Sequence, residues 1–491
     1  MVSGGGRVIQ HRNKRIRFSL QRRGIKFVGF VVVIMECGAC GTLPGIPLSN
    51  EATDPINEDA YELLARFVHI SDAQIVDEES PARLATAADF TLSAWRPYEA
   101  YSSQLLDGTI RTINKLHVAD SPIDFVVHTG DATDNAQLNE LRWFVDVFDG
   151  GEIDPLSGVD DRESGTLPDP LLDPHHTFIA QGLYRNGVHG DAPTIAWYTI
   201  IGNHDRFGVG VFPIVTDLLG RRVSPLPIEE RFGLLLPAAL DPIGYRSWGP
   251  ISPAHPGPPP RLNLPTTIQA NPDRRYITDE DFVTAHLDSA TIPAGHGLDR
   301  DHPARTWYSV SPVPGVRLIG LNSATPLVEQ PGLAYSEGSI SWAQVVFLRA
   351  ELAVAQSNGE TVIVATHHPS DSLEPVYGSA LSPQLFRGML NEFDSVALHI
   401  AGHWHEHATF DQGGYVEMVT SSIIDAPQEG RVIEIWRERE GGLGGSRHTL
   451  RYSTFSHLDA IDPPDDSHAA LFADPLLDLR RTAAELAGVM R

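Results

Sequence analysis

The chain contains very little cysteine. Its 491 residues include two cysteines, Cys37 and Cys40, and both lie near the N-terminus. Because no cysteine follows Cys40, the rest of the chain can form no disulfide, thiolate nucleophile or cysteine-bound zinc site. Any metal held downstream must therefore be bound by nitrogen and oxygen ligands.

Positive charge is also scarce. The chain has 37 Lys and Arg against 63 Asp and Glu, which gives a formal net charge of -26. Such a surface repels polyphosphate backbones unless a local basic or metal-bearing cleft reverses the field, so we expect no nucleic acid partner. With 42% hydrophobic and 20% charged residues, the composition is that of a folded globular protein, not a disordered or fibrous one.

Residues 1–40 have the pattern of a targeting segment. Basic residues precede an apolar stretch from Phe27 to Met35, which is too short to span a bilayer as a stable helix. Arg22-Arg23-Gly24-Ile25-Lys26 resembles a twin-arginine export signal, and Gly38-Ala39-Cys40 resembles the end of a lipoprotein cleavage site. We expect an exported protein of the periplasm or cell envelope, with membrane attachment through a lipidated Cys40. The alternative is that these residues are disordered, or that the true start of the protein lies downstream of Met1.

After a linker at about 41–60, apolar runs alternate with helical patterns. Six runs are predicted to be buried strands: 66–70, 123–127, 197–201, 316–321, 361–365 and 396–400. Helices are predicted at 98–116, 138–148 and 341–355, where apolar residues recur on one face. This alternation predicts an α/β layered fold.

The main domain is expected to cover 61–455, followed by a C-terminal segment at 456–491. Its later strands, 415–420, 431–436 and 448–453, are predicted to form antiparallel hairpins. Two stretches at about 150–192 and 207–304 are rich in loop-forming residues and do not fit the alternation. We interpret them as loop-rich insertions over the active-site edge or as surface decoration.

Five polar clusters follow predicted strands, at the edge where open α/β sheets place their ligands. They are Ser71-Asp72-Ala73-Gln74, Thr129-Gly130-Asp131-Ala132-Thr133-Asp134-Asn135, Ile201-Gly202-Asn203-His204-Asp205, Thr366-His367-His368-Pro369 and Ala401-Gly402-His403-Trp404-His405. Taken together they resemble the calcineurin-like metallophosphoesterase superfamily, whose pattern is D-x-H, G-D-x-x-D, G-N-H-[DE], H with Pro close behind, and G-H-x-H. The resemblance implies a four-layer α/β/β/α sandwich.

The resemblance also implies a reaction: hydrolysis of phosphate mono- or diesters of a small phosphorylated substrate by hydroxide bound to a dinuclear metal centre. One cation would take Asp72, Gln74, Asp131 and His405. The other would take Asp131, Asn203, His367 and His403. This mixed set of oxygen and imidazole ligands fits two divalent ions and does not single out Mn, Fe or Zn.

Gln74 departs from the family pattern, which usually has His at this position. A neutral amide oxygen replaces an imidazole nitrogen, so we expect lower affinity and a preference that moves toward Mn. Gln at this place also occurs in members of the superfamily that act on nucleotide diphosphate derivatives. Hydrolysis of nucleotide pyrophosphate bonds is therefore one alternative.

His204 is the expected catalytic acid in the family pattern, with Asp134 as the carboxylate that orients it. Four further residues are candidates for contact with the substrate or for support of the ligands: Asn135, Asp205, Arg206 and His368. Outside these motifs we interpret histidines as surface or hydrogen-bonded residues, namely His128, His175, His176, His399 and His407. Arg431 lies at the start of a predicted strand, and we interpret it as a structural residue. Asn322 lies at the end of another predicted strand, and we interpret it as a candidate to support the metal ligands.

Two other functions stay open at this point. A non-catalytic, envelope-bound binding protein could keep the fold with a degraded metal site, and Gln74 is the feature that favours it. A dinuclear hydrolase could also act on a bond other than a phosphoester, which composition does not distinguish.

Overall fold

The structure is a computed structural model, and it describes residues 46–47, 56–77, 80, 101–117, 121–155, 157, 177–185, 194–208, 210–211, 215–216, 222–223, 234–236, 266–268, 271–324, 337–374, 381–439 and 448–460. The chain divides into Met1–Glu36 and Cys37–Arg491, and all described residues lie in the second unit. Among them, no helix combines the length and apolar character needed to cross a bilayer. The expected export signal, Cys40 and the chain after residue 460 lie outside these ranges.

A five-stranded sheet holds the first three motifs. Its order is β18-β17-β2-β3-β6, with bounds β2 Tyr61–Ile70, β3 Phe125–His128, β6 Ala196–Thr199, β17 Glu429–Glu438 and β18 His448–Ser456. Strands β2, β3 and β6 run parallel, whereas β17 pairs antiparallel with both β2 and β18. Parallel pairing brings the carboxyl ends of β2, β3 and β6 to one edge of the sheet.

A seven-stranded sheet holds the last two motifs. Its order is β1-β15-β16-β14-β13-β12-β11, with bounds β1 Ile46–Pro47, β11 Tyr308–Val313, β12 Val316–Gly320, β13 Thr361–Ala365, β14 Val396–Ala401, β15 Ala408–Asp411 and β16 Val416–Val419. Strands β12, β13, β14 and β16 are parallel. The carboxyl ends of β13 and β14 therefore also share an edge.

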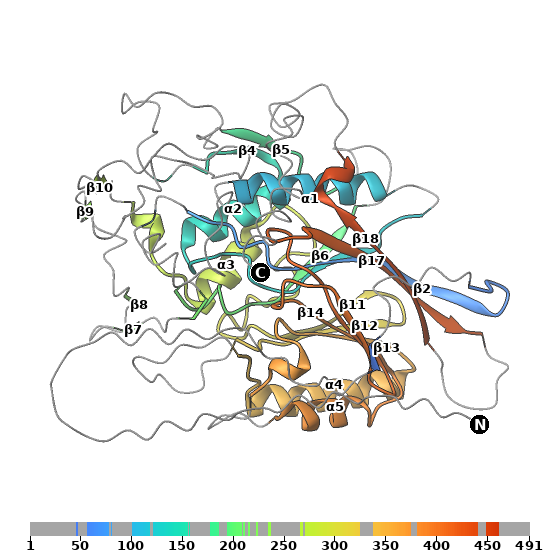
Figure 1. Cartoon of the computed structure of the whole chain (residues 1–491). Helices are drawn as coiled ribbons and strands as arrows, with labels where there is room; N and C mark the ends of the chain where they lie inside the picture. Colours follow the sequence, from blue (N-terminus) through green and yellow to red (C-terminus); the bar gives the residue numbers. More distant parts are fainter. Residues whose placement is uncertain are drawn as a thin grey trace, which may run out of the picture. The chain divides into compact units, whose positions relative to one another are not determined.

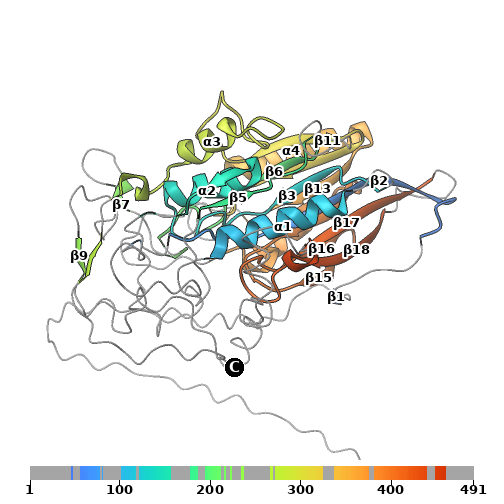
Figure 2. The same cartoon turned by 90° about the horizontal axis from the view of Figure 1, so that it is seen from above.

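The inner faces of the two sheets share one apolar core. Phe67 and Phe125 of the five-stranded sheet belong to the same buried cluster as Ile363 and Leu398 of the seven-stranded sheet. On its other face the five-stranded sheet packs against α1 (Ser102–Leu116) and α2 (Leu138–Asp149), as Figures 1 and 2 show. Both faces of the central strands are buried, which explains their continuous apolar runs.

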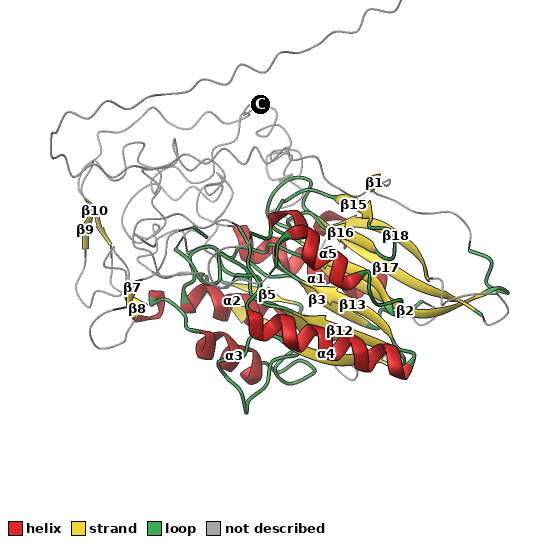
Figure 3. Ribbon diagram, turned by 90° about the horizontal axis from the view of Figure 1, so that it is seen from below, coloured by secondary structure: helices red, strands yellow, loops and turns green. Residues whose placement is uncertain are grey.

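The outer face of the seven-stranded sheet is covered by α4 (Trp342–Asn358) and α5 (Pro383–Leu390) (Figure 3). Leu348 and Leu352 of α4 and Phe386 of α5 contact Val362 and its neighbours on that face. Alternation along β13 sends Ile363 to the inner core and Val362 to the outer one. The α/β class predicted from the sequence is confirmed.

The second expected insertion is not loop throughout. Its end holds helix α3 (Asp279–Asp288), whose Thr278 forms a capping box with Asp281 and whose Phe282 and Val283 enter the inter-sheet core. The first insertion contributes β4 (Gly151–Ile153), paired antiparallel with β5 (Phe178–Ala180). Strand β7 (Val215–Thr216) pairs antiparallel with β8 (Arg222–Val223), and β9 (Leu234–Leu236) pairs antiparallel with β10 (Thr266–Ile268).

Candidate metal centre

Asp131 lies at the centre of the assembled motifs. Its Oδ2 is 3.3 Å from His367 Nε2 and 3.2 Å from Gln74 Nε2. Its Oδ1 accepts a hydrogen bond from the His204 backbone N–H at 2.8 Å. One carboxylate on the loop after β3 thus touches the loops after β2, β6 and β13, as a ligand shared by two cations must.

His405 and Asp72 define one side of the cluster. His405 Nδ1 donates to Asp425 Oδ2 at 2.6 Å, and its Nε2 faces Asp72 Oδ1 at 3.2 Å. That buried carboxylate oxygen accepts no hydrogen bond in the described structure. A proton on Nε2 or a metal ion between the two atoms makes this contact favourable, so the pair fits a cation site.

Gln74 reaches the same side. Its amide nitrogen lies 3.4 Å from His405 Nε2 and 3.2 Å from Asp131 Oδ2. Rotation of the amide by half a turn would present its oxygen, the atom that binds a cation, to the same place. The departure from the family pattern therefore keeps a donor group within the cluster.

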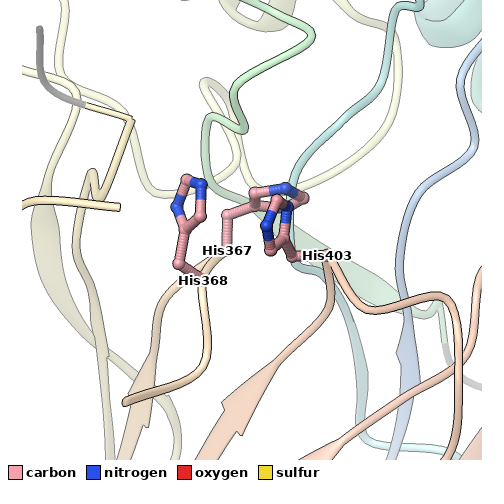
Figure 4. Close-up of side chains that lie close together, drawn as sticks. All are labelled: His367, His368 and His403. Atoms are coloured by element: carbon pink, nitrogen blue, oxygen red, sulfur yellow. The ribbon is translucent and has the colours of Figure 1, made fainter. Parts of the chain in front are cut away.

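A second group of nitrogen donors also adjoins Asp131. His367 Nε2 is 2.8 Å from Asn203 Oδ1, and its Nδ1 donates to the Thr129 carbonyl at 2.8 Å. Nitrogens of His367, His368 and His403 lie within 4.8 Å of one another. Figure 4 shows these rings gathered from the loops after β13 and β14. The backbone contact fixes His367 with Nε2 turned into the group.

The electrostatics of the cluster favour positive charge. Burial by itself would lower the pKa of His405, but the carboxylates of Asp72 and Asp425 raise it to about 10. Burial likewise opposes protonation of His367, yet Asp131 and Asp72 raise its pKa to about 9. Burial and the charge on His367 lower the pKa of His403 to about 3, which leaves its lone pair free. A field that stabilises imidazolium also stabilises a bound cation.

The backbone at the cluster is strained. Positive φ values occur at five of the expected ligands, Asp72 (54°), Gln74 (40°), Asp131 (58°), His403 (70°) and His405 (57°). Such conformations cost on the order of 1 kcal/mol or more each and persist where surrounding contacts enforce them. The strain turns each of these side chains toward a common centre.

Two motif glycines make the close approach of these loops possible. A Cβ at Gly202 would overlap Asp131 Oδ1, and a Cβ at Gly402 would overlap Ser71 Oγ and Asp72 Oδ2. The glycines thus allow the loop after β6 to meet the one after β3, and the loop after β14 to meet the one after β2.

His204 lies at the edge of the centre with its side chain 13% exposed. Its Nδ1 donates to the Asp134 carbonyl oxygen at 2.8 Å and lies 3.5 Å from the Asp134 carboxylate. Gly210 packs against its Nε2 edge, where a Cβ could not fit. Asp134 therefore holds the ring through both its backbone and its side chain. His204 is not among the expected metal ligands.

Three expected substrate contacts have partners within the protein. Asp205 accepts hydrogen bonds from the Asp131, Thr133 and Gly202 backbone N–H groups. Asn135 donates to Glu140 at 2.8 Å, and Arg206 Nη2 donates to both carboxylate oxygens of Asp279 at 2.8 Å. These contacts favour positioning roles, and a contact with substrate stays a prediction. His368, in contrast, adjoins the cluster, with Nδ1 2.8 Å from Ser323 Oγ.

Two supporting carboxylates were not predicted from the sequence. Asp425 orients His405, and it follows a polar Ser421-Ser422 pair after β16. Glu140 accepts four N–H bonds, from Asp77, Gln137 and twice from Asn135. The capping box that joins Gln137 to Glu140 at the start of α2 was the available signal for the second.

The remaining histidines and polar candidates have structural contacts. His128 is buried beside Thr199, His399 contacts Thr366 and Glu417, and His407 lies 3.3 Å from Glu429. Arg431 is buried and donates to the Val419 carbonyl, and Asn322 donates to Thr306. His175 and His176 lie outside the described residues.

The sequence profile described as calcineurin-like phosphoesterase matches residues 65–407. No curated protein matches the chain. A dimetal phosphatase from Danio rerio is 15% identical, with 79% of this chain and 99% of that chain covered and a TM-score of 0.39. The inner-membrane-complex anchor GAP50 of Plasmodium is 8% identical, with 83% and 99% covered and a TM-score of 0.31. The chain therefore belongs to the calcineurin-like phosphoesterase family and is a metal-dependent phosphoester hydrolase.

Proposed function

We propose that this protein hydrolyses mono- or diesters of a small phosphorylated substrate at a centre of two divalent cations. The observation that carries the proposal is the cluster around Asp131, which groups with Asp72 and His367 and adjoins the pairs His405 with Asp72 and His367 with Asn203. The first cation would be held by Asp72, Gln74, Asp131 and His405. The second would be held by Asp131, Asn203, His367 and His403.

The bound cations would neutralise phosphate charge and lower the pKa of a water that attacks phosphorus. The protein's own contribution to bond breakage comes from His204, whose Nδ1 is held by Asp134. Protonated on Nε2, the ring can donate to the leaving oxygen as the bond from phosphorus to that oxygen breaks. Asp134 thus orients the ring.

A nitrogen-rich second site bears on the choice of metal. The nitrogens of His367 and His403 favour Zn or Fe at that site, whereas Gln74 offers an amide oxygen and favours Mn at the first. We therefore expect a centre that accepts Mn, Fe or Zn, with the tighter ion on the His367 side.

The direct test is hydrolysis of p-nitrophenyl phosphate and bis(p-nitrophenyl) phosphate by purified protein with added Mn. We expect activity that chelators abolish. On an alkyl phosphate, whose leaving group needs an acid, His204→Ala should lose roughly 100-fold or more with both ions retained. His403→Ala should lose activity together with metal. Activity that persists both in chelator and in His403→Ala would contradict the proposal.

A second substrate class is favoured by one observation. Gln74 lies within the centre in place of the usual His, as in superfamily members that act on nucleotide diphosphate derivatives. A panel that includes a nucleoside diphosphate derivative tests it, and faster hydrolysis of the pyrophosphate bond than of either p-nitrophenyl ester would support it. A non-catalytic binding protein with a degraded site would instead hold fewer than two ions per chain.

We also propose that the protein is exported and attached to a membrane through Cys40. Support comes from Arg22-Arg23 and from Gly38-Ala39-Cys40 in the sequence. Fractionation of cells followed by mass spectrometry of the mature N-terminus tests both parts. A mature chain that begins at Cys40 with a lipid mass is expected, and Cys40→Ala should release the protein from the membrane fraction.

A further inference from the structure

Arg274 and Asp77 form a buried ion pair that the metal centre does not use. Arg274 Nε lies 3.0 Å from Asp77 Oδ2, and each side chain is 1% exposed. Removing two charges from water opposes folding, so burial of such a pair is weak evidence for stability by itself. The segments that the Arg274–Asp77 pair connects indicate its role.

Ser157 joins the pair to both segments that the sequence analysis treats as insertions. Arg274, in the second segment, donates through Nη2 to the Ser157 hydroxyl at 2.8 Å and to its carbonyl at 3.2 Å. The Ser157 hydroxyl, in the first segment, donates to the other oxygen of Asp77. A single buried group therefore fastens both segments to the loop that follows the Asp72 motif.

Asp77 continues the network into the first turn of α2. Its carboxylate accepts from Asn139 Nδ2 at 2.7 Å and from Gln137 Nε2 at 3.2 Å. Its backbone N–H donates to Glu140 Oε1 at 3.0 Å, and Glu140 in turn accepts from the N–H and the amide of Asn135. Asn135 is the neighbour of Asp134.

The chain just after Arg274 pairs directly with the loop that carries Asp134. Ile277 N–H donates to the Ala136 carbonyl at 2.9 Å, and Leu138 N–H donates to the Arg275 carbonyl at 3.0 Å. Ala136 has a φ of 56°, a left-handed conformation that an alanine adopts only under restraint. The restraint comes from this pairing and from Glu140.

We propose that the Arg274–Asp77 ion pair is a positioning device for the catalytic acid. It holds the strained 134–137 loop in register, so that the Asp134 carbonyl and carboxylate keep His204 aimed at the leaving oxygen. The inference rests on the proposed role of His204. Arg274 and Asp77 themselves touch neither substrate nor ligand, and they act through Asp134.

Leaving-group dependence separates this role from a general structural one. p-Nitrophenolate departs without a proton, whereas an alkoxide needs an acid. In Arg274→Lys, which keeps the charge and loses the planar fork, we expect kcat to fall about tenfold or more on an alkyl phosphate and less than about threefold on p-nitrophenyl phosphate. KM and the content of two ions per chain should not change.

Arg275→Lys is the matched control, because its guanidinium pairs with Asp281 at a half-exposed position. It should leave both rates unchanged. Ser157→Ala is a milder second variant that removes one hydroxyl from the network, and it should show the same preference with smaller losses. In a His204→Ala background, Arg274→Lys should cause no further loss on the alkyl ester.

Hydrogen exchange of metal-free protein gives a readout that needs no activity. Arg274→Lys should speed exchange at the Asn135 and Ile277 amides, and Arg275→Lys should not. Equal losses on both esters, additive losses in the His204→Ala background, or unchanged exchange at these amides would overturn the inference while leaving the proposed function intact. Wild-type protein inert on every ester would overturn both.

Discussion

His405 donates through Nδ1 to the carboxylate of Asp425 at 2.6 Å, and this bond turns its Nε2 toward Asp72. A carboxylate behind a ligating imidazole fixes the ring and raises its basicity, and loss of such a partner commonly costs about 10- to 100-fold in metal affinity. The pair lies in two loops of the seven-stranded sheet, while Asp72 comes from the other sheet.

Asp425→Ala should therefore weaken the first cation site by about 10- to 100-fold while the second site keeps its ion. Metal analysis after dialysis against a graded chelator measures this as a fall from two ions per chain toward one. Glu429→Ala is the control, because Glu429 pairs with His407, which lies outside the centre. Equal metal loss in both variants would count against the assigned role.

Gln74→His should strengthen the same site. The position has a φ of 40°, and histidine tolerates the left-handed region better than most residues. An imidazole nitrogen in place of an amide oxygen should raise affinity and move the preference from Mn toward Zn. Competitive titration with Mn and Zn checks this, and an unchanged order of affinities would show that residue 74 does not bind the ion.

Gly402→Ala should disrupt the centre because its Cβ would overlap Ser71 Oγ and Asp72 Oδ2. We expect a loss of about 1–3 kcal/mol in the free energy of unfolding, together with weaker metal binding. Gly388 of α5 is the matched control, since a Cβ there meets nothing within 4 Å. Gly388→Ala should instead stabilise the protein by about 0.5–1 kcal/mol in urea denaturation.

His286 should make the fold sensitive to acid. Burial among Phe144, Trp197 and Phe282 lowers the pKa of His286 from 6.5 to about 4. Between these values the unfolded chain binds a proton that the folded chain does not, so stability present above pH 6.5 is lost as the pH falls toward 4. For this one group the loss from pH 7 to pH 5 is about 2 kcal/mol.

His286→Phe should remove that part of the pH dependence. Urea denaturation of both proteins at pH 7 and pH 5 gives the comparison, and the difference between the two pH values should be about 2 kcal/mol smaller in the variant. If wild type and variant lose the same free energy between these pH values, the buried imidazole is not the source.

The strands and the cluster residues could be predicted because their signal is local. Thr361–Ala365 is a short apolar run followed at once by His367, and the structure has β13 over the same residues. Parallel strands share an edge, so the polar residues behind them meet. Helix α5, with eight residues, gave too short a pattern to recognise, and the capping box of α3 lay within a proline-rich stretch.

The supporting contacts could not be predicted, because they join distant segments. Arg274 and Asp77 are 197 residues apart, and His405 meets Asp425 only after β15 and β16 have turned the chain back. The positive φ values at Asp72 and Gln74 also have no local signal, since neither residue is glycine. Tertiary contacts impose these conformations on sequences that would otherwise avoid them.

The most direct test is anomalous diffraction from crystals of Mn-loaded protein. We predict two peaks about 3.5–4 Å apart on either side of the Asp131 carboxylate, one beside His405 and Asp72 and the other beside Asn203 and His367. A single peak that Asp131 does not contact, or no peak near these residues in protein that hydrolyses phosphoesters, would contradict the account.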